Sequence, residues 1–133
     1  KKSYDDYITY LTTLKELDLR SNNLTTLPEW TLNLTNLVGL YLGNNELTNL
    51  EGISKLTNLE VLNLDGNELT NLEGIGNLTN LVGLNLQSNK LTSLPEGIIN
   101  LTNLERLDLQ RNPISDEEKV RIKKLLPNTS INF

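Results

Sequence analysis

The chain has 133 residues, of which 37% are hydrophobic and 22% are charged, so it is long enough for one domain with a modest core. It contains no cysteine and no histidine, which excludes disulfides, thiolate metal sites and the commonest general base. The formal net charge of −5 disfavours binding to nucleic acid and to anionic membranes. No apolar run approaches the roughly 20 residues of a membrane span. We therefore expect no catalytic residue, no cofactor and no membrane insertion.

The first 13 residues are predicted to be a partial repeat with an N-terminal cap. Residues 8–13 carry isoleucine and leucine at the spacing that recurs in residues 75–80, which indicates the tail of an incomplete repeat. Residues 3–7 are then a short, poor cap, compatible with a domain that continues upstream.

Residues 14–114 contain five copies of one pattern, L-x-x-L-x-L-x-x-N-x-L, in which isoleucine takes the last place of the fifth copy. The copies start 23, 22, 22 and 23 residues apart. They read LKELDLRSNNL (14–24), LVGLYLGNNEL (37–47), LEVLNLDGNEL (59–69), LVGLNLQSNKL (81–91) and LERLDLQRNPI (104–114). Because one copy cannot bury its leucines alone, stacked copies must share a continuous core.

Within each copy, the alternation of leucine with other residues predicts a short strand with one apolar face, as at Leu40 and Leu42. An asparagine ends each strand, and the next apolar residue returns to the core. The stretch that follows, such as residues 70–80, has apolar spacing suited to a 3₁₀ or irregular convex segment. Parallel strands about 4.8 Å apart would then line a concave face.

Residues 115–133 are predicted to close the other end with a helix and a final strand. Ser115 and Glu118 have the spacing of a capping box, and Pro127 stops the helix. Residues 130–133 alternate apolar side chains inward, which indicates a sixth strand.

These motifs resemble the leucine-rich-repeat family over nearly the whole chain. The 22-residue copies with LTNL are similar to internalin-type surface repeats, and the 23-residue copies with LPEGI to the spirochaete and cyanobacterial type. The ending NPISDEEKVRIKKLLPN resembles the terminal module of many bacterial members. The resemblance implies an α/β solenoid, curved as a right-handed horseshoe, with short parallel strands on its concave face. In this family the repeat asparagines hydrogen-bond backbone groups of their turn and its neighbour.

The resemblance also implies a non-catalytic module that recognises a protein or peptide, is monomeric, and is secreted or bacterial cell-surface rather than cytoplasmic. Two alternatives remain open. The chain is a structural spacer, fragment or engineered scaffold without its own ligand, or it is the substrate-recognition part of a larger bacterial effector enzyme.

Three columns of side chains are expected on the concave face. The middle column is Asp18, Tyr41, Asn63, Asn85 and Asp108, and its flanks are Glu16, Gly39, Val61, Gly83, Arg106 and Arg20, Gly43, Asp65, Gln87, Gln110. Because these side chains are free of packing duty, they are the expected partner-facing surface. The candidate ligand-binding residues are Asp18, Arg20, Tyr41, Val61, Asn63, Asp65, Asn85, Gln87, Arg106 and Asp108. The acidic character of this face favours a partner with a basic patch.

Two carboxylate columns are candidate calcium ligands. Glu46 stacks on Glu68, and Glu51 on Glu73, in adjacent turns. A calcium site needs several oxygen ligands per turn, and the first column continues into Lys90, so we predict no metal site.

Trp30 interrupts the repeat at the place of Gly97, and Thr31 takes the place of the core-facing Ile98. The ring is either exposed on the convex side or turned into the core by a one-residue shift. A large apolar ring beside a missing isoleucine favours the shift.

Overall fold

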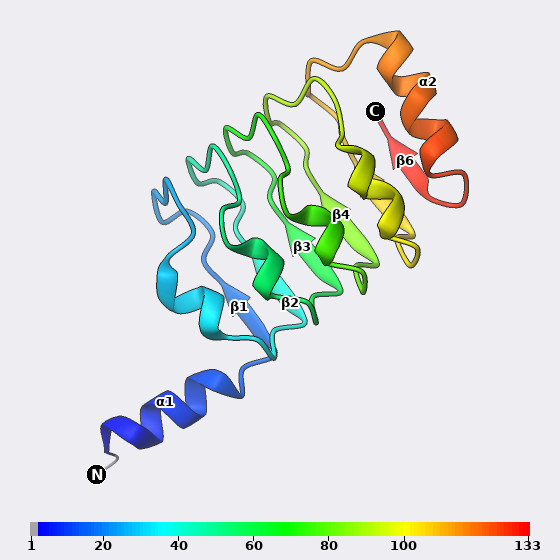
Figure 1. Ribbon diagram of the computed structural model, residues 1–133. Helices are drawn as coiled ribbons and strands as arrows, with labels where there is room; N and C mark the ends of the chain where they lie inside the picture. The colour runs from blue at the N-terminus through cyan, green and yellow to red at the C-terminus, as the bar shows by residue number, and fades with distance from the viewer. Residues whose placement is uncertain (1–2) are drawn as a thin grey trace.

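The computed structural model describes residues 3–133, and Figure 1 shows them as a curved stack of coils with one parallel sheet along a single face. The strands are β1 (Glu16–Asp18), β2 (Gly39–Tyr41), β3 (Val61–Asn63), β4 (Gly83–Asn85), β5 (Arg106–Asp108) and β6 (Ser130–Asn132). They are hydrogen-bonded in chain order, and matching repeat positions are paired throughout, as Leu40 is with Leu17 and Leu62. The predicted α/β solenoid and its sixth strand are confirmed.

The opposite, convex side is built from short 3₁₀ helices that face the strands across one core. They are η1 (Glu29–Asn33), η2 (Ile53–Lys55), η3 (Ile75–Asn77) and η4 (Glu96–Asn100). Strand residues such as Leu62 and convex residues such as Ile75 are fully buried in the same core cluster. Each coil therefore contributes apolar residues from both sides, and the core continues through the stack.

The repeat asparagines form a buried ladder between neighbouring coils, as the family resemblance implied. Asn67 is typical: its Oδ1 accepts from the Leu47 N–H at 3.0 Å, and its Nδ2 donates to the carbonyls of Leu42 and Leu64, each at 3.0 Å. Similar contacts are made by Asn45, Asn89 and Asn112. One amide thus satisfies backbone groups of two coils at once.

The N-terminal segment differs from the expected partial repeat. Residues 8–13 do not form a convex repeat segment, because α1 (Tyr4–Thr12) is a continuous α-helix up to Thr12. A complete capping box between Ser3 and Asp6 starts this helix, and no glycine interrupts it. The corresponding segment before η3 instead turns at Gly74, whose φ is +92°.

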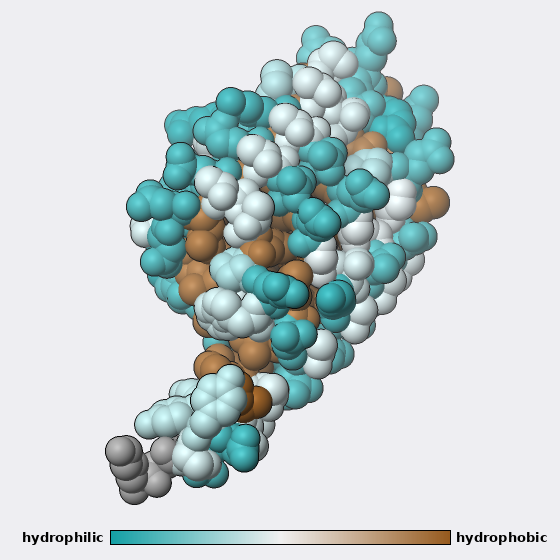
Figure 2. Space-filling view, turned by 60° about the vertical axis from the view of Figure 1, so that its left-hand side comes forward, coloured by the Kyte–Doolittle hydropathy of each residue, from teal (hydrophilic) through white to brown (hydrophobic). Residues whose placement is uncertain are grey.

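The end of the solenoid beside α1 is the least covered part of the core. Helix α1 buries no residue and extends away from the stack in Figure 1. Figure 2 shows apolar residues gathered at this end, where Leu17, Leu19 and Leu24 are only partly buried. Their counterparts in the next coil are buried.

Trp30 does not enter the core, so the predicted one-residue shift is wrong. The Trp30 side chain is 48% exposed, and Thr31 is 1% exposed in the core position. The threonine hydroxyl donates to the Pro28 carbonyl, which satisfies its polar group where an isoleucine stands in the other 23-residue convex segment. Because its hydroxyl is hydrogen-bonded, Thr31 can occupy the core position, and η1 keeps the residue register of the other 23-residue repeat.

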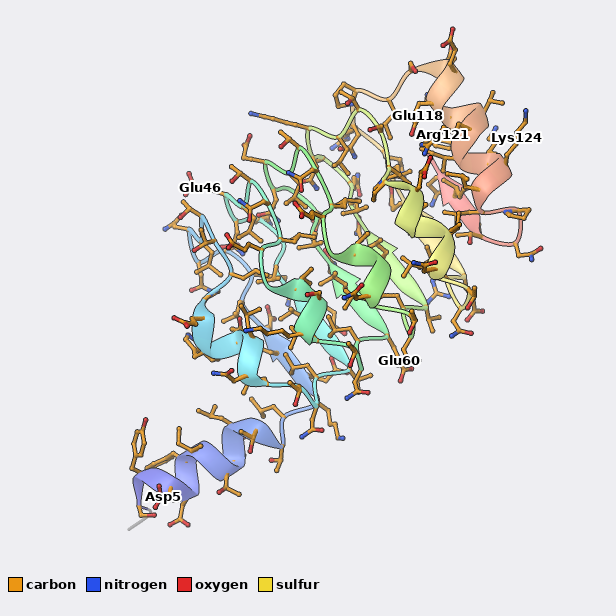
Figure 3. All side chains as sticks on the ribbon, viewed as in Figure 1. Asp5, Glu46, Glu60, Glu118, Arg121 and Lys124 are labelled. Carbon is orange, nitrogen blue, oxygen red and sulfur yellow. The ribbon has the colours of Figure 1, made fainter. Side chains whose placement is uncertain are left out.

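At the other end, only half of the expected capping box forms. The Ser115 hydroxyl accepts from the Glu118 N–H at 3.1 Å, but the Glu118 carboxylate turns to the preceding repeat. It accepts from the Leu94 N–H at 3.0 Å and from Arg121 Nη1 at 2.8 Å. Arg121 also donates to the Leu94 carbonyl at 3.1 Å. These contacts hold α2 (Asp116–Leu125) against the loop before η4, near the labelled pair in Figure 3.

We expect Glu118→Ala to lower the free energy of unfolding by roughly 1–3 kcal/mol, because it leaves the Leu94 N–H and a half-buried guanidinium without their acceptor. Urea denaturation monitored by circular dichroism measures this loss. Glu117→Ala is the control, since Glu117 is exposed on the same helical turn. An equal loss in both variants would contradict this role of Glu118.

Candidate functional site

Side chains of the middle column of the concave face stabilise the turns that follow their own strands. In this column Oδ1 of an aspartate or asparagine accepts from the backbone N–H two residues later, at 3.0–3.1 Å. The residues are Asp18, Asn63, Asn85 and Asp108. These four side chains therefore stabilise the end of each strand, a role that the repeat pattern did not reveal.

Tyr41 is the exception in this column, and two glycines leave space on either side of it. A Cβ atom at Gly39 would overlap the Glu16 carboxylate, and one at Gly43 would lie 2.5 Å from Asp65 Oδ1. Glu16 comes from β1, and Asp65 follows β3. The two neighbouring coils thus each place a carboxylate over a glycine of the coil that carries Tyr41.

The charges around Tyr41 are only partly balanced. Arg20 Nη2 lies 2.7 Å from Asp18 Oδ2, and Arg20 Nε donates to Asp18 Oδ1 at 3.0 Å. These hydrogen bonds lower the pKa of Asp18 and commit the guanidinium to that residue. Within residues 3–133, neither Glu16 nor Asp65 forms an ion pair. Two carboxylates near Tyr41 are therefore available to a cation.

Burial raises the pKa of the Tyr41 hydroxyl above its usual value, and the nearby Glu16 carboxylate raises it further. We expect Glu16→Gln to lower the pKa of Tyr41 while leaving it above about 10, because burial remains. Tyrosinate absorbance, with the Tyr41→Phe curve subtracted, measures this change. Glu60→Gln, which alters a carboxylate outside the concave columns, should leave the pKa of Tyr41 unchanged.

The raised pKa of Tyr41 also makes the stability of the protein depend on pH. A raised pKa in the folded state stabilises the protein below the unfolded value of about 10, and this contribution is lost as the pH rises through the folded pKa. The native protein should therefore lose more stability than Tyr41→Phe in alkaline solution. Parallel loss in the two proteins would contradict the assignment.

A groove crosses the other half of the concave face, with a volume of about 310 Å³. Its lining includes Val61, Asn63, Gly83, Asn85, Arg106, Asp108, Ser130 and Asn132. Arg106 Nη2 would lie 3.6 Å from a Cβ at Gly83, so the guanidinium extends from β5 over β4. Among residues 3–133, Arg106 forms no ion pair, while Asp108 accepts from Gln110.

The structure separates the predicted site residues into two groups. Asp18, Arg20, Tyr41 and Asp65 lie around β1 and β2, whereas Val61, Asn63, Asn85, Arg106 and Asp108 line the groove. Gln87 follows β4 and is not among the residues that line the groove. Sequence reasoning left Glu16, Gly39, Gly83 and Asn132 out of the site. Glu16, Gly39 and Gly83 belong to one flank column, which has a charged residue at each end and two glycines inside. This pattern was the sequence signal that pointed to these three residues.

In residues 3–133 no group of three or more acidic side chains is placed to hold a metal ion. Glu68 forms an ion pair with Lys90, which neutralises part of one carboxylate column. No described helix is long and apolar enough to cross a bilayer.

Coils of strand, asparagine turn and 3₁₀ segment, stacked on one core, define a solenoid repeat protein that displays its sheet on the concave side. The family model for the leucine rich repeat matches residues 12–69 and 57–114. The chain belongs to the leucine-rich-repeat family, whose fold commonly mediates protein binding.

Solved structures with the same fold include bacterial proteins. A leucine-rich-repeat protein of Leptospira interrogans is 44% identical with a TM-score of 0.89, over 98% of this chain and 34% of that one. An internalin of Listeria monocytogenes is 29% identical with a TM-score of 0.78, over 94% of this chain and 36% of that one. TLR13 in complex with ssRNA13 is 30% identical with a TM-score of 0.76, over 88% of this chain and 18% of that one. The chain thus spans about a third of the two bacterial proteins. No curated protein matches it.

Proposed function

We propose that this domain is a non-catalytic recognition module that binds a protein or peptide through its concave face. The observation that carries the proposal is Tyr41, the one large aromatic side chain of the concave columns, placed between two carboxylates that form no ion pair within residues 3–133. Tyrosine is over-represented among residues that dominate binding energy. Carboxylates beside it favour a basic partner and suppress acidic ones.

The rest of the concave face suits a rigid platform. Its turns are held by the side chains of the middle column, so little order has to be gained on binding. Six strands at about 4.8 Å span roughly 24 Å, which fits a small or standard interface of several hundred Å² per partner.

A protein or peptide ligand is favoured over nucleic acid by the local charge. Four charged residues around Tyr41 are Glu16, Asp18, Asp65 and Arg20, which together carry a net charge of −2. Such a surface repels phosphate backbones. The RNA in the TLR13 complex therefore provides a contrasting ligand for the test.

The test is selection of a random linear peptide library, displayed on phage, against the immobilised native protein. Peptides that are enriched should bind Tyr41→Glu and Asp65→Lys more weakly by roughly tenfold or more, as expected for a hot spot. Glu73→Lys makes the same charge change as Asp65→Lys but lies before η3 on the convex side, and it should have no effect.

Two results would contradict the proposal. Equal affinity of the enriched peptides for native protein, Tyr41→Glu and Asp65→Lys would remove the concave face from consideration. Enrichment no greater than on Tyr41→Glu would support a spacer without its own ligand. Single-stranded RNA of random sequence should not compete with the peptides.

A further inference from the structure

One row of the concave face carries opposite charges at its two ends. Strand pairing places its members side by side across five strands. The row reads Glu16, Gly39, Val61, Gly83 and Arg106. It is symmetric about the single apolar side chain, with a glycine on each side and a charged residue beyond each glycine.

The glycines allow both charged side chains to lean toward the centre of the row. The Glu16 carboxylate lies over Gly39 of β2, and the Arg106 guanidinium lies over Gly83 of β4. Val61 of β3 is between them and is partly exposed. Because β2 and β4 are two strand spacings apart, the opposite charges are separated by roughly 10 Å.

Both charged ends are available to a partner. In the described part of the chain, no ion pair involves Glu16, Asp65 or Arg106, whereas Arg20 is held by Asp18. A cation placed between the two carboxylates would also meet the face or edge of the Tyr41 ring, and aromatic faces attract cations. A carboxylate at the other end would meet a guanidinium with several free donors.

The floor between these ends offers hydrogen-bond donors for a peptide backbone. Asn63 and Asn85 use Oδ1 to hold their own turns. Their Nδ2 groups donate to no residue in the range 3–133, and both residues line the 310 Å³ groove. Two amide donors at one strand spacing suit the carbonyl groups of a ligand that crosses the strands.

An extended segment presents alternate side chains on one face, about 6.7 Å apart. Three alternate positions therefore span roughly 13 Å. Long charged side chains at the two outer positions can lean inward, which matches the roughly 10 Å between the two charged ends of the row. We propose that the concave face selects an extended peptide segment of the pattern basic-x-apolar-x-acidic, in either chain direction. The basic side chain would lie at Tyr41 between Glu16 and Asp65, the apolar one on Val61, and the acidic one on Arg106. This inference rests on the proposed function of the concave face and specifies its ligand.

The test uses a phage library in which five adjacent positions are random, selected in parallel on the native protein and on Arg106→Glu. On the native protein, enriched peptides should carry a basic and an acidic residue four positions apart. Selection on Arg106→Glu should replace the acidic residue by a basic one. Synthetic peptides with the acid changed to glutamine should bind the native protein roughly tenfold more weakly, and this difference should disappear on Arg106→Gln.

Lys55→Gln is the control, since Lys55 is an exposed cation on η2 of the convex side; it should retain the preference for the acidic residue. Enriched peptides that depend on Tyr41 but show no acidic preference, or keep it on Arg106→Glu, would overturn this inference and leave the proposed function standing. Peptides indifferent to both Tyr41→Glu and Arg106→Glu would overturn both proposals.

Discussion

Replacing Asn67 with leucine is expected to lower the free energy of unfolding by roughly 2–3 kcal/mol, because one buried backbone N–H loses its acceptor and two buried carbonyls each lose a donor. Asn67 is 5% exposed. Its loss leaves the Leu47 N–H without an acceptor. The carbonyls of Leu42 and Leu64 lose one of two amide donors each, since Asn45 and Asn89 still donate to them. Leucine has the same number and branching of side-chain heavy atoms, so the substitution leaves no cavity.

The first repeat supplies the control for this substitution. Asn22 occupies the same repeat position but is exposed, and its Nδ2 donates to the Arg20 carbonyl alone. Asn22→Leu should therefore cost less than about 1 kcal/mol. Urea denaturation of both variants, monitored by circular dichroism, compares the two losses. Equal losses would show that the buried ladder does not stabilise the stack.

The second large effect is expected at a convex position. Ile98 is 0% exposed, so Ile98→Ala removes a side chain from the continuous core and leaves a cavity. The expected loss is roughly 3–4 kcal/mol, within the range of such substitutions. Because each coil contacts only its neighbours, the destabilisation should begin in the coils around η4. Hydrogen exchange, measured by mass spectrometry on peptic fragments, locates it.

Ile99 is the matched control for Ile98, since it is the next residue of the same 3₁₀ helix and is 50% exposed. Ile99→Ala should change the unfolding free energy by less than about 1 kcal/mol. If the two variants lose similar stability, the register of η4 differs from the one described.

The candidate site could be predicted from sequence as a set of columns, but not as a set of roles. The spacing of the repeats was sufficient to place Asn63, Asn85 and Asp108 on the concave face. It could not show that their side chains hold the backbone two residues later, because asparagine and aspartate suit both a ligand and a turn. The columns therefore overstated how many side chains are free to bind.

The errors outside the site have local physical causes. The Trp30 prediction rested on the apolar ring being better suited to the core than the polar Thr31. In the structure the threonine hydroxyl donates to the Pro28 carbonyl, so threonine can be buried there. The N-terminal prediction followed apolar spacing, whereas the capping box at Ser3 and the absence of a glycine turn produce an α-helix there. In both cases a backbone hydrogen bond outweighed the apolar pattern.

The sequence by itself determined the strands, the shared core and the asparagine ladder. Each coil packs only on its neighbours, so a pattern repeated every 22 or 23 residues carries nearly all the information that the stack requires. Only the tertiary structure decided that Glu16 and Asp65 fill the space over Gly39 and Gly43 beside Tyr41, and that Glu118 holds the preceding repeat rather than its own cap. These contacts join long side chains of neighbouring coils, and their directions depend on which space the adjacent coil leaves open.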